Sequence, residues 1–266
     1  MSAETNLLRS DTTLFEFPLN ERFRAYLRLD ALHQRWQHYL QSNHAQDHHS
    51  ALMTLFEIND FAFRYDLKSD LIFDINRYKL SLNHLRHLPD LSEQKLVETL
   101  LRLSDAQKQI EQSPKFGSVL SDNDWLLNVK TRIVVPGGIC SSDIGFYYQW
   151  LQQPAHWRRT DLETWWLPLA PLFETLQLLL MIVRNAIKHK SCMTDKKAYQ
   201  IPLNGTRFDL LQVKLPNSST YLPDISANKH VIWLRFALPS YRSQPQHLLP
   251  AHPSQEIQFD LNLCGM

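Results

Sequence analysis

The sequence predicts an α+β protein, with an N-terminal helical bundle and a mostly antiparallel β-sheet domain. In the first half of the 266 residues, apolar side chains recur at three- and four-residue steps, as on the core face of a helix. From about residue 198 the period changes to two, as in half-buried strands. We therefore expect a helical domain over residues 12–131 plus 156–192, a β domain over 132–155 plus 196–264, and a flexible N-terminal tail over 1–11.

The helices are predicted from apolar stripes and from the residues that begin them. Asn20 is a candidate N-cap, and Glu21 suits the positive end of a helix dipole. The stripe that follows has the spacing of a core-facing helix and consists of Phe23, Tyr26, Leu29, Leu32, Trp36 and Tyr39. The same pattern predicts helices over residues 50–65, 69–86, 92–112, 122–130, 143–152 and 160–190.

The last of these helices contains the most apolar run of the chain, Leu176–Val183. We consider this run too short to span a bilayer, and Glu174, Gln177 and Arg184 interrupt the apolar pattern around it. We therefore expect a buried core helix and no membrane insertion. The N-terminus has no apolar segment of the secretory kind, so we expect a cytoplasmic location.

Two strands follow from strict alternation. In residues 230–238, the side chains Ile232, Leu234, Phe236 and Leu238 fall on one face, and Val231, Trp233 and Arg235 fall on the other. Residues 257–263 alternate in the same way. Residues 197–203 and 207–215 are further strands on a less regular pattern, and a loop is predicted over 240–254, which contains three prolines.

Half of the six glycines fall in one short segment, at Gly137, Gly138 and Gly145. Pro136 fixes the backbone for the first corner of a turn, and Gly137 can adopt the positive φ that a type II turn requires next. The segment therefore predicts a strand, a sharp structural turn at Pro136, Gly137 and Gly138, and a helix, with Arg132 just before the turn. The oxygens that could cap this helix belong to Ser141, Ser142 and Asp143.

The common signatures of catalysis and of cofactor binding are missing from the sequence. It has no P-loop, no dinucleotide-binding glycine pattern and no nucleophile elbow. Cys140, Cys192 and Cys264 have no zinc-site spacing, which favours free thiols in a reducing compartment. Cys140 could be a nucleophile at a helix N-terminus, but a buried structural thiol is the favoured interpretation. We predict no catalytic residue, no metal and no cofactor.

The charge is unevenly distributed along the chain. The net charge is +1, yet residues 184–242 carry ten basic and three acidic side chains, a net of +7. In this segment Trp233 and Arg235 share the strand face that points away from the core. They could anchor a protein partner. Alternatively, Trp233 packs under a helix or in a dimer interface, and the basic segment 184–242 could also bind nucleic acid, with Tyr221, Trp233 and Tyr241 as stacking aromatics.

Four blocks of residues resemble the ZapD family of bacterial cell division proteins, which bundle filaments of the tubulin-like protein FtsZ. The blocks extend over nearly the whole chain, and their order and spacing together are specific. They are Phe15–Glu21 with Arg24, Leu27 and Arg28; Arg132, Pro136–Gly138, Cys140, Ser141 and Asp143 with Trp150 and Leu151; Asp209–Leu211; and Pro223, Ile225, Ser226, Lys229, Arg235 and Phe236.

The resemblance implies a non-enzymatic homodimer that captures the C-terminal tail of FtsZ in a basic pocket, bundles FtsZ protofilaments at mid-cell and lowers FtsZ GTPase activity. Family positions linked to tail binding or bundling fall on Arg28, Arg64, Arg132 and Arg235. With Lys229 and Trp233, these residues are our candidate partner-binding set. Val231 stands where the family pattern leads us to expect a second basic residue, four before Arg235, and Lys229 or His230 could replace part of that charge.

Overall fold

The computed structural model describes residues 11–84, 86, 92–137, 139–194, 198–238 and 256–265. The N-terminal tail up to residue 10, Gly138 and the predicted loop over 240–254 lie outside these residues. The chain forms two compact units. We call Ala25–Met181 the helical unit, and Met1–Arg24 together with Ile182–Met266 the β unit. The helices precede most of the antiparallel strands, which confirms the α+β class.

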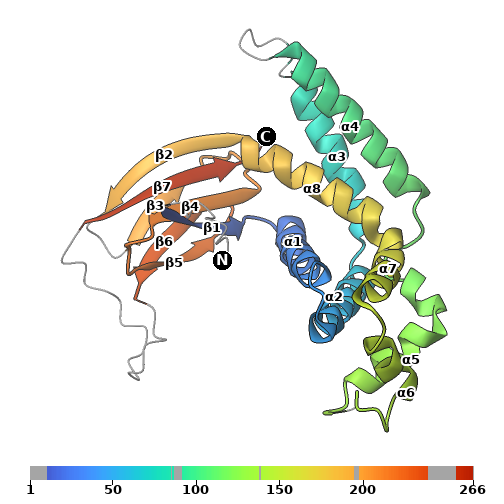
Figure 1. Ribbon diagram of the computed structural model, residues 1–266. Coiled ribbons are helices and arrows are strands. Elements are labelled where there is room, and N and C mark those ends of the chain that lie inside the picture. Colours follow the sequence, from blue (N-terminus) through green and yellow to red (C-terminus); the bar gives the residue numbers. More distant parts are fainter. Residues whose placement is uncertain are drawn as a thin grey trace, which may run out of the picture. The chain divides into compact units, whose positions relative to one another are not determined.

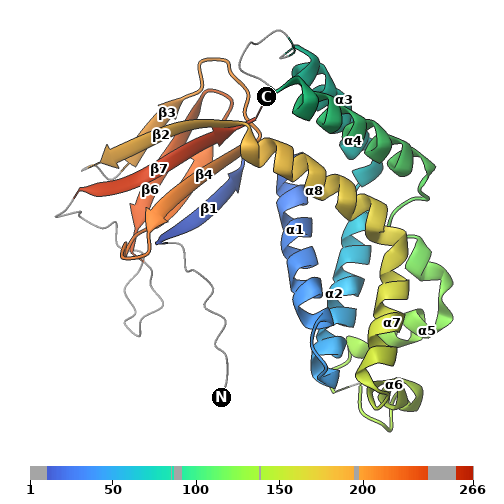
Figure 2. The same ribbon diagram turned by 45° about the horizontal axis from the view of Figure 1, so that its top comes forward.

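In the helical unit, short turns connect the first three helices, and longer segments lead into and out of α5 (Figure 1). The helices α3 and α4 lie side by side, as Figure 2 also shows. The predicted stripe of the first helix is buried at Phe23, Tyr26, Leu29 and Trp36, whereas Leu32 and Tyr39 are half-buried. The helices are α1 (Glu21–Leu40), α2 (Ala45–Arg64), α3 (Leu67–His84), α4 (Glu93–Gln112), α5 (Asp124–Ile133), α6 (Gly145–Leu151), α7 (Ala155–Trp166) and α8 (Ala170–Asn185), with short 3₁₀ turns at Val119–Asp122 and Leu167–Leu169.

The helical stretch Ala155–Asn185, which comprises α7, α8 and the turn between them, begins and ends five residues earlier than the helix predicted over 160–190. By length and composition it could cross a membrane, so our expectation that its apolar run is too short is not supported. However, 56% of its most apolar window is buried inside the structure. Leu172, Leu176 and Leu179 are fully buried, as in the core helix of a folded domain.

The β unit contains two antiparallel sheets, labelled in Figures 1 and 2. The four-stranded sheet has the order β1-β4-β7-β2, and the three-stranded sheet has the order β3-β6-β5. Their facing side chains form one apolar cluster, which includes Val213, Leu234 and Phe259. The strands are β1 (Thr12–Pro18), β2 (Ile187–Thr194), β3 (Ala198–Pro202), β4 (Leu210–Pro216), β5 (Leu222–Ala227), β6 (Val231–Ala237) and β7 (Ile257–Cys264).

Two strands lie where we expected the helical domain. Residues 12–18 form β1 and pair with β4, in keeping with their threonines and phenylalanines, which favour strands. Residues 187–194 form β2 instead of extending the preceding helix, because they pair with β7 along their whole length. Alternation of buried and exposed residues in β2 is visible only at Cys192 and Thr194, so the sequence pattern does not reveal this strand.

The strand predicted at Arg132–Val135 is wrong. Asn123 caps α5, its Oδ1 accepting a hydrogen bond from the Leu126 N–H at 3.0 Å, and the helix continues through Ile133. The run of β-branched residues 133–135 favours a strand locally, but helix and turn prevail. The residues described in 132–155 are helices and turns that belong to the helical unit, not to a β domain. Gly137 does adopt a positive φ of 74°, as the turn prediction requires.

Candidate partner-binding surfaces

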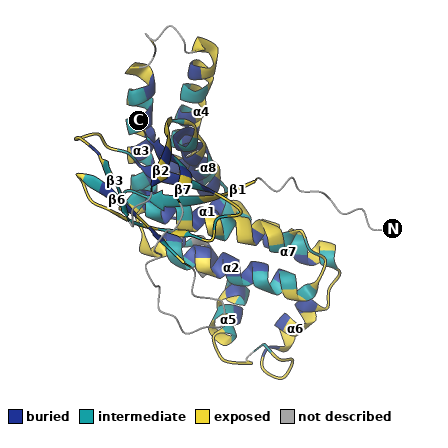
Figure 3. Ribbon diagram, turned by 90° about the vertical axis from the view of Figure 1, so that its left-hand side faces the viewer, coloured by how far each residue is buried: buried dark blue, intermediate teal, exposed yellow. Residues whose placement is uncertain are grey.

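Trp233 and Arg235 lie on the outward face of β6, as the alternation predicts. Ile232, Leu234 and Phe236 are buried on the opposite face, whereas Trp233 is half-buried and Arg235 is exposed. The pairing of β5 with β6 places Ser226 opposite Trp233, and Asp224 opposite Arg235. Figure 3 shows teal and yellow positions, which are intermediate and exposed, around β3 and β6.

A surface hollow of about 290 Å³ lies beside this pair of side chains, and we call it the Trp233 hollow. Ser226, Ala227 and Asn228 form its other wall. Because the residues opposite Trp233 and beside it are short, the indole ring stays accessible from solvent. An aromatic ring next to a guanidinium is typical of the residues that contribute most to protein interfaces.

Lys229 lies in a tight turn directly after Asn228, which lines the Trp233 hollow. The Oδ1 of Asn228 accepts hydrogen bonds from the N–H groups of His230 and Val231, at 2.8 and 3.0 Å. The N–H of Asn228 donates to the carbonyl of Val231 at 3.0 Å, which closes the turn. Asparagine at this position fixes the loop through its own side chain, so Lys229 projects from an ordered backbone.

The charges of this surface are not neutralised within the part of the chain that the structure describes. Among the described residues, neither the side chain of Lys229 nor that of Arg235 takes part in a hydrogen bond or an ion pair. Asp224 is the cross-strand neighbour of Arg235 but makes no ion pair with it among these residues. Val231 is half-buried on the same face and adds no charge. The positive charge of the surface therefore comes from Lys229 and Arg235.

Arg28 lies on an exposed position of α1 in the helical unit. It borders a largely apolar hollow of about 430 Å³, which we call the Arg28 hollow, together with Leu32, Arg35 and Phe61. Arg35 is bonded within the helical unit: its guanidinium forms an ion pair with Glu57, and its Nε donates to the Thr54 hydroxyl at 3.1 Å. Arg28 makes no such bond among the described residues, so its guanidinium is available to a partner.

Arg64 is the last residue of α2 and borders a second hollow, of about 530 Å³, which we call the Arg64 hollow. Two lysines line it as well. Lys68 is already bonded within the chain, because its Nζ donates to the carbonyls of Glu111 and Ser113, both at 2.8 Å. The ammonium of Lys115 lies 5.0 Å from the centre of the Phe63 ring, a cation–π contact.

The Arg28 and Arg64 hollows meet at a pair of aromatic rings. Phe61 borders the first and Tyr65 the second, and their ring centres are 4.5 Å apart with nearly parallel planes. The structure thus brings Arg28 and Arg64 to adjoining hollows of one surface. Sequence reasoning missed Phe61, Tyr65 and Lys115; aromatic residues four apart at the end of a helix were the available signal.

Arg132 stands apart from these hollows. It lies exposed in the last turn of α5, where a positive charge suits the helix dipole. Val134 and Val135 follow it and are 76% and 50% exposed, so Arg132 borders an apolar patch rather than a hollow. Cys140 is also exposed, so our expectation of a buried thiol was wrong. It does not lie at a helix N-terminus either, because α6 begins only at Gly145.

Comparison with known proteins decides the family. The model of the ZapD family, described as a cell division protein, matches residues 27–235. The cell division protein ZapD of Ralstonia pickettii (strain 12J) is 36% identical over 254 residues, covering 95% of this chain and 99% of the relative. The ZapD of Cupriavidus taiwanensis is 37% identical over the same span. The chain belongs to the ZapD family of cell division proteins.

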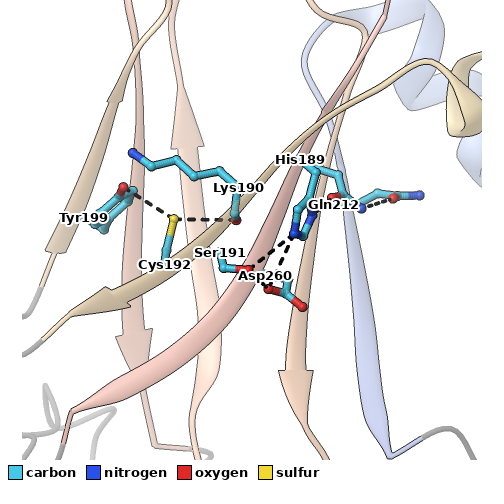
Figure 4. A network of polar contacts seen from close by, with 8 residues as sticks. His189, Lys190, Ser191, Cys192, Tyr199, Gln212 and Asp260 are labelled. Carbon is cyan, nitrogen blue, oxygen red and sulfur yellow. Dashed lines mark hydrogen bonds and ion pairs between the residues drawn. The ribbon is translucent and has the colours of Figure 1, made fainter.

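Membership of the ZapD family agrees with the prediction that the chain is not an enzyme. One cluster on the four-stranded sheet contains the residue types of a hydrolase triad, namely His189, Ser191 and Asp260 (Figure 4). The order of its hydrogen bonds differs from that of a triad. Ser191 Oγ donates directly to the Asp260 carboxylate at 2.7 Å, whereas the nearest nitrogen of His189 lies 3.9 Å from that carboxylate. In a triad, the histidine stands between the two.

The same cluster continues as a chain of hydrogen bonds across the sheet. Arg184 pairs with Glu16, which accepts from Gln212 at 2.9 Å; Gln212 accepts from Asn262 at 3.0 Å. Asn262 Oδ1 then faces His189 Nδ1 at 2.8 Å. Arg184 belongs to α8, and the three links from Glu16 to His189 each connect neighbouring strands, so in this ZapD family member the network stabilises the sheet.

Proposed function

We propose that this ZapD family member binds the C-terminal tail of FtsZ and, as a homodimer, cross-links FtsZ protofilaments into bundles at the division septum. The observation that carries the proposal is the set of exposed arginines at surface hollows, Arg28 and Arg64 in the helical unit and Arg235 in the β unit. The family positions linked to tail binding or bundling fall on these three arginines and on Arg132.

Charge complementarity supports an acidic partner. Arg28, Lys229 and Arg235 have no ion pair within the described part of the chain, so binding a carboxylate requires no internal bond to break. Ion pairs of this exposed kind steer association more than they hold a complex together, and salt weakens them. We therefore expect tail binding to weaken as ionic strength rises.

Bundling follows from bivalency. A homodimer carries two copies of each tail-binding surface, and each copy can hold a tail from a different filament. Many tails line one filament, so weak individual contacts add up along two filaments that lie side by side. We expect the aligned filaments to exchange subunits more slowly and FtsZ GTPase activity to fall.

Binding of a fluorescent FtsZ tail peptide tests this proposal, with Arg235→Glu as the key variant. We expect the Kd of this variant to rise about tenfold or more at low salt, because one attraction becomes a repulsion. The matched control is Arg207→Glu, which makes the same charge change at an exposed position of the β unit outside the Trp233 hollow. Equal affinity of both variants and the wild type would refute a role for Arg235.

A further inference from the structure

Phe61 and Tyr65 form what we call the aromatic bridge, the stacked pair between the Arg28 and Arg64 hollows. Tyr65 is 42% exposed, and the neighbouring Phe63 is 56% exposed. Large aromatic side chains are costly to leave in water, and tyrosine and arginine are enriched where proteins meet. The bridge therefore combines an apolar surface with cations on both sides.

The charge around the aromatic bridge is predominantly positive. Arg28 lies on one side, and Arg64 and Lys115 lie on the other. Asp66 also borders the Arg64 hollow, but its Oδ1 accepts from the Ser69 N–H at 3.3 Å and so begins α3. A ligand that matches both the charge and the apolar character of this surface carries carboxylates on both sides of an apolar side chain.

The backbone around the Arg64 hollow is fixed by close packing. Gly117 has a φ of +86°, and a Cβ atom placed on it would lie 2.5 Å from the Phe63 nitrogen. The loop that carries Lys115 thus rests directly on the backbone of α2, and the adjacent Phe116 is 2% exposed. A preformed surface of this kind loses little conformational entropy when a ligand binds.

We propose that the aromatic bridge is the specificity element of the tail site in the helical unit. It accepts an apolar side chain of the acidic tail, while the tail carboxylates pair with Arg28 on one side and with Arg64 and Lys115 on the other. This inference rests on the proposed function. It adds a requirement that charge alone does not impose, namely that the acidic peptide carries an apolar side chain.

The salt dependence of binding distinguishes this apolar contact from attraction between charges. Ion pairs at an exposed surface weaken as salt screens them, whereas burial of apolar surface does not depend on attraction between charges. A patch of cations alone would bind any polyanion and release it at high salt. The aromatic bridge predicts a component of tail binding that persists at high salt and that requires the apolar residues of the peptide.

The test is binding of FtsZ tail peptides to the full-length chain by fluorescence anisotropy, at low and at high salt. We expect Phe61→Ser and Tyr65→Ser each to weaken binding of the natural tail peptide about tenfold at both salt concentrations. The control is Phe73→Ser, because Phe73 is 54% exposed on α3 and borders neither hollow. We expect its Kd to stay within about twofold of the wild-type value.

A second peptide tests the same contact without changing the protein. In this peptide the apolar residues are replaced by serine and the acidic residues are kept. We expect it to bind the wild type about tenfold more weakly than the natural tail, with no further loss in the two bridge variants. This arm remains informative even if a bridge variant does not fold, which circular dichroism would reveal.

The outcomes separate this inference from the proposed function. If the wild type binds no tail peptide, the proposed function fails. If the wild type binds the natural and the serine-substituted peptides equally, only the role of the bridge is overturned. Sedimentation equilibrium adds a further check: loss of a dimer in the bridge variants would assign Phe61 and Tyr65 to a contact between two copies and overturn the inference.

Discussion

Arg158 is a buried cation that joins the α1–α2 turn to the α6–α7 turn within the helical unit. Its guanidinium donates to the carbonyls of Asn43 and Leu151, at 2.9 and 3.0 Å, and to that of Gln153. Its Nε donates to Nδ1 of the buried His48 at 3.1 Å. That nitrogen must therefore be unprotonated in the folded state, because it accepts this hydrogen bond.

His48 makes the stability of the helical unit depend on pH. Burial lowers the pKa of His48, and the charge of Arg158 lowers it further; burial also lowers the pKa of His33 and His49. A lowered pKa means that the unfolded chain binds more protons, so these residues destabilise the fold as pH falls below their ordinary value of about 6.5.

We expect a lower thermal midpoint at about pH 5.5 than at about pH 7.5, by about 2–4 °C for each kcal/mol of unfolding free energy lost. In His48→Asn, an amide oxygen can still accept from Arg158 but cannot be protonated in this range, so the midpoint should change less with pH. Scanning calorimetry at both pH values measures this. A wild-type midpoint that is equal at both would contradict the assignment.

At the scale of elements, two glycines with positive φ differ in what surrounds them. Gly117, at φ +86°, packs against the backbone of α2, whereas Gly137, at φ +74°, has no atom within 4 Å of an added Cβ. Both substitutions to alanine impose a left-handed backbone on a residue that disfavours it, at a cost of about 1–2 kcal/mol. Only Gly117→Ala adds a steric clash with α2.

We therefore expect Gly117→Ala to lower the unfolding free energy by about 3 kcal/mol or more, and Gly137→Ala by about 1 kcal/mol. Chemical denaturation followed by circular dichroism compares the two variants directly. Gly117→Ala should also weaken tail binding, because the loop that carries Lys115 must move. Equal destabilisation by both substitutions would show that the close approach to α2 has no energetic importance.

Elements with strong periodicity could be predicted from the sequence, and elements fixed by tertiary pairing could not. The alternation in β6 placed Trp233 and Arg235 on the outward face correctly, because one face of that strand is buried. In β2, pairing with β7 determines the structure, while its largely exposed side chains leave no clear period. At residues 133–135, capping by Asn123 and continuation of α5 outweighed local strand propensity.

The family resemblance proposes the arginines of the candidate site, but the shape of the surface around them could not be predicted from the sequence. Arg28, Arg64 and Arg235 were chosen from the resemblance, and each borders a hollow. The aromatic bridge was not predicted, because Phe61 has the spacing of a core residue of α2 and Tyr65 lies just past its end. Which aromatic side chains remain exposed depends on how α1, α2 and the loop at Lys115 pack, and one sequence does not reveal that.

At the scale of the whole molecule, the proposed bundling requires two copies of a tail-binding surface that act together. A monomeric form of the chain would bind tails without joining filaments, whereas a dimer can hold two filaments at once. Because each contact includes exposed charges, bundling should decline with salt more steeply than binding of a single tail peptide does. Salt weakens every tail contact in a bundle, so the losses of binding free energy add up over the contacts that two filaments share.

The most direct test is sedimentation of FtsZ filaments with this chain, using full-length FtsZ and FtsZ that lacks its C-terminal tail. With full-length FtsZ, we expect low-speed centrifugation to pellet bundled filaments together with the added chain at low salt. With tail-deleted FtsZ, we expect the filaments and the chain to stay in the supernatant. Bundling of tail-deleted filaments at full strength would contradict the account.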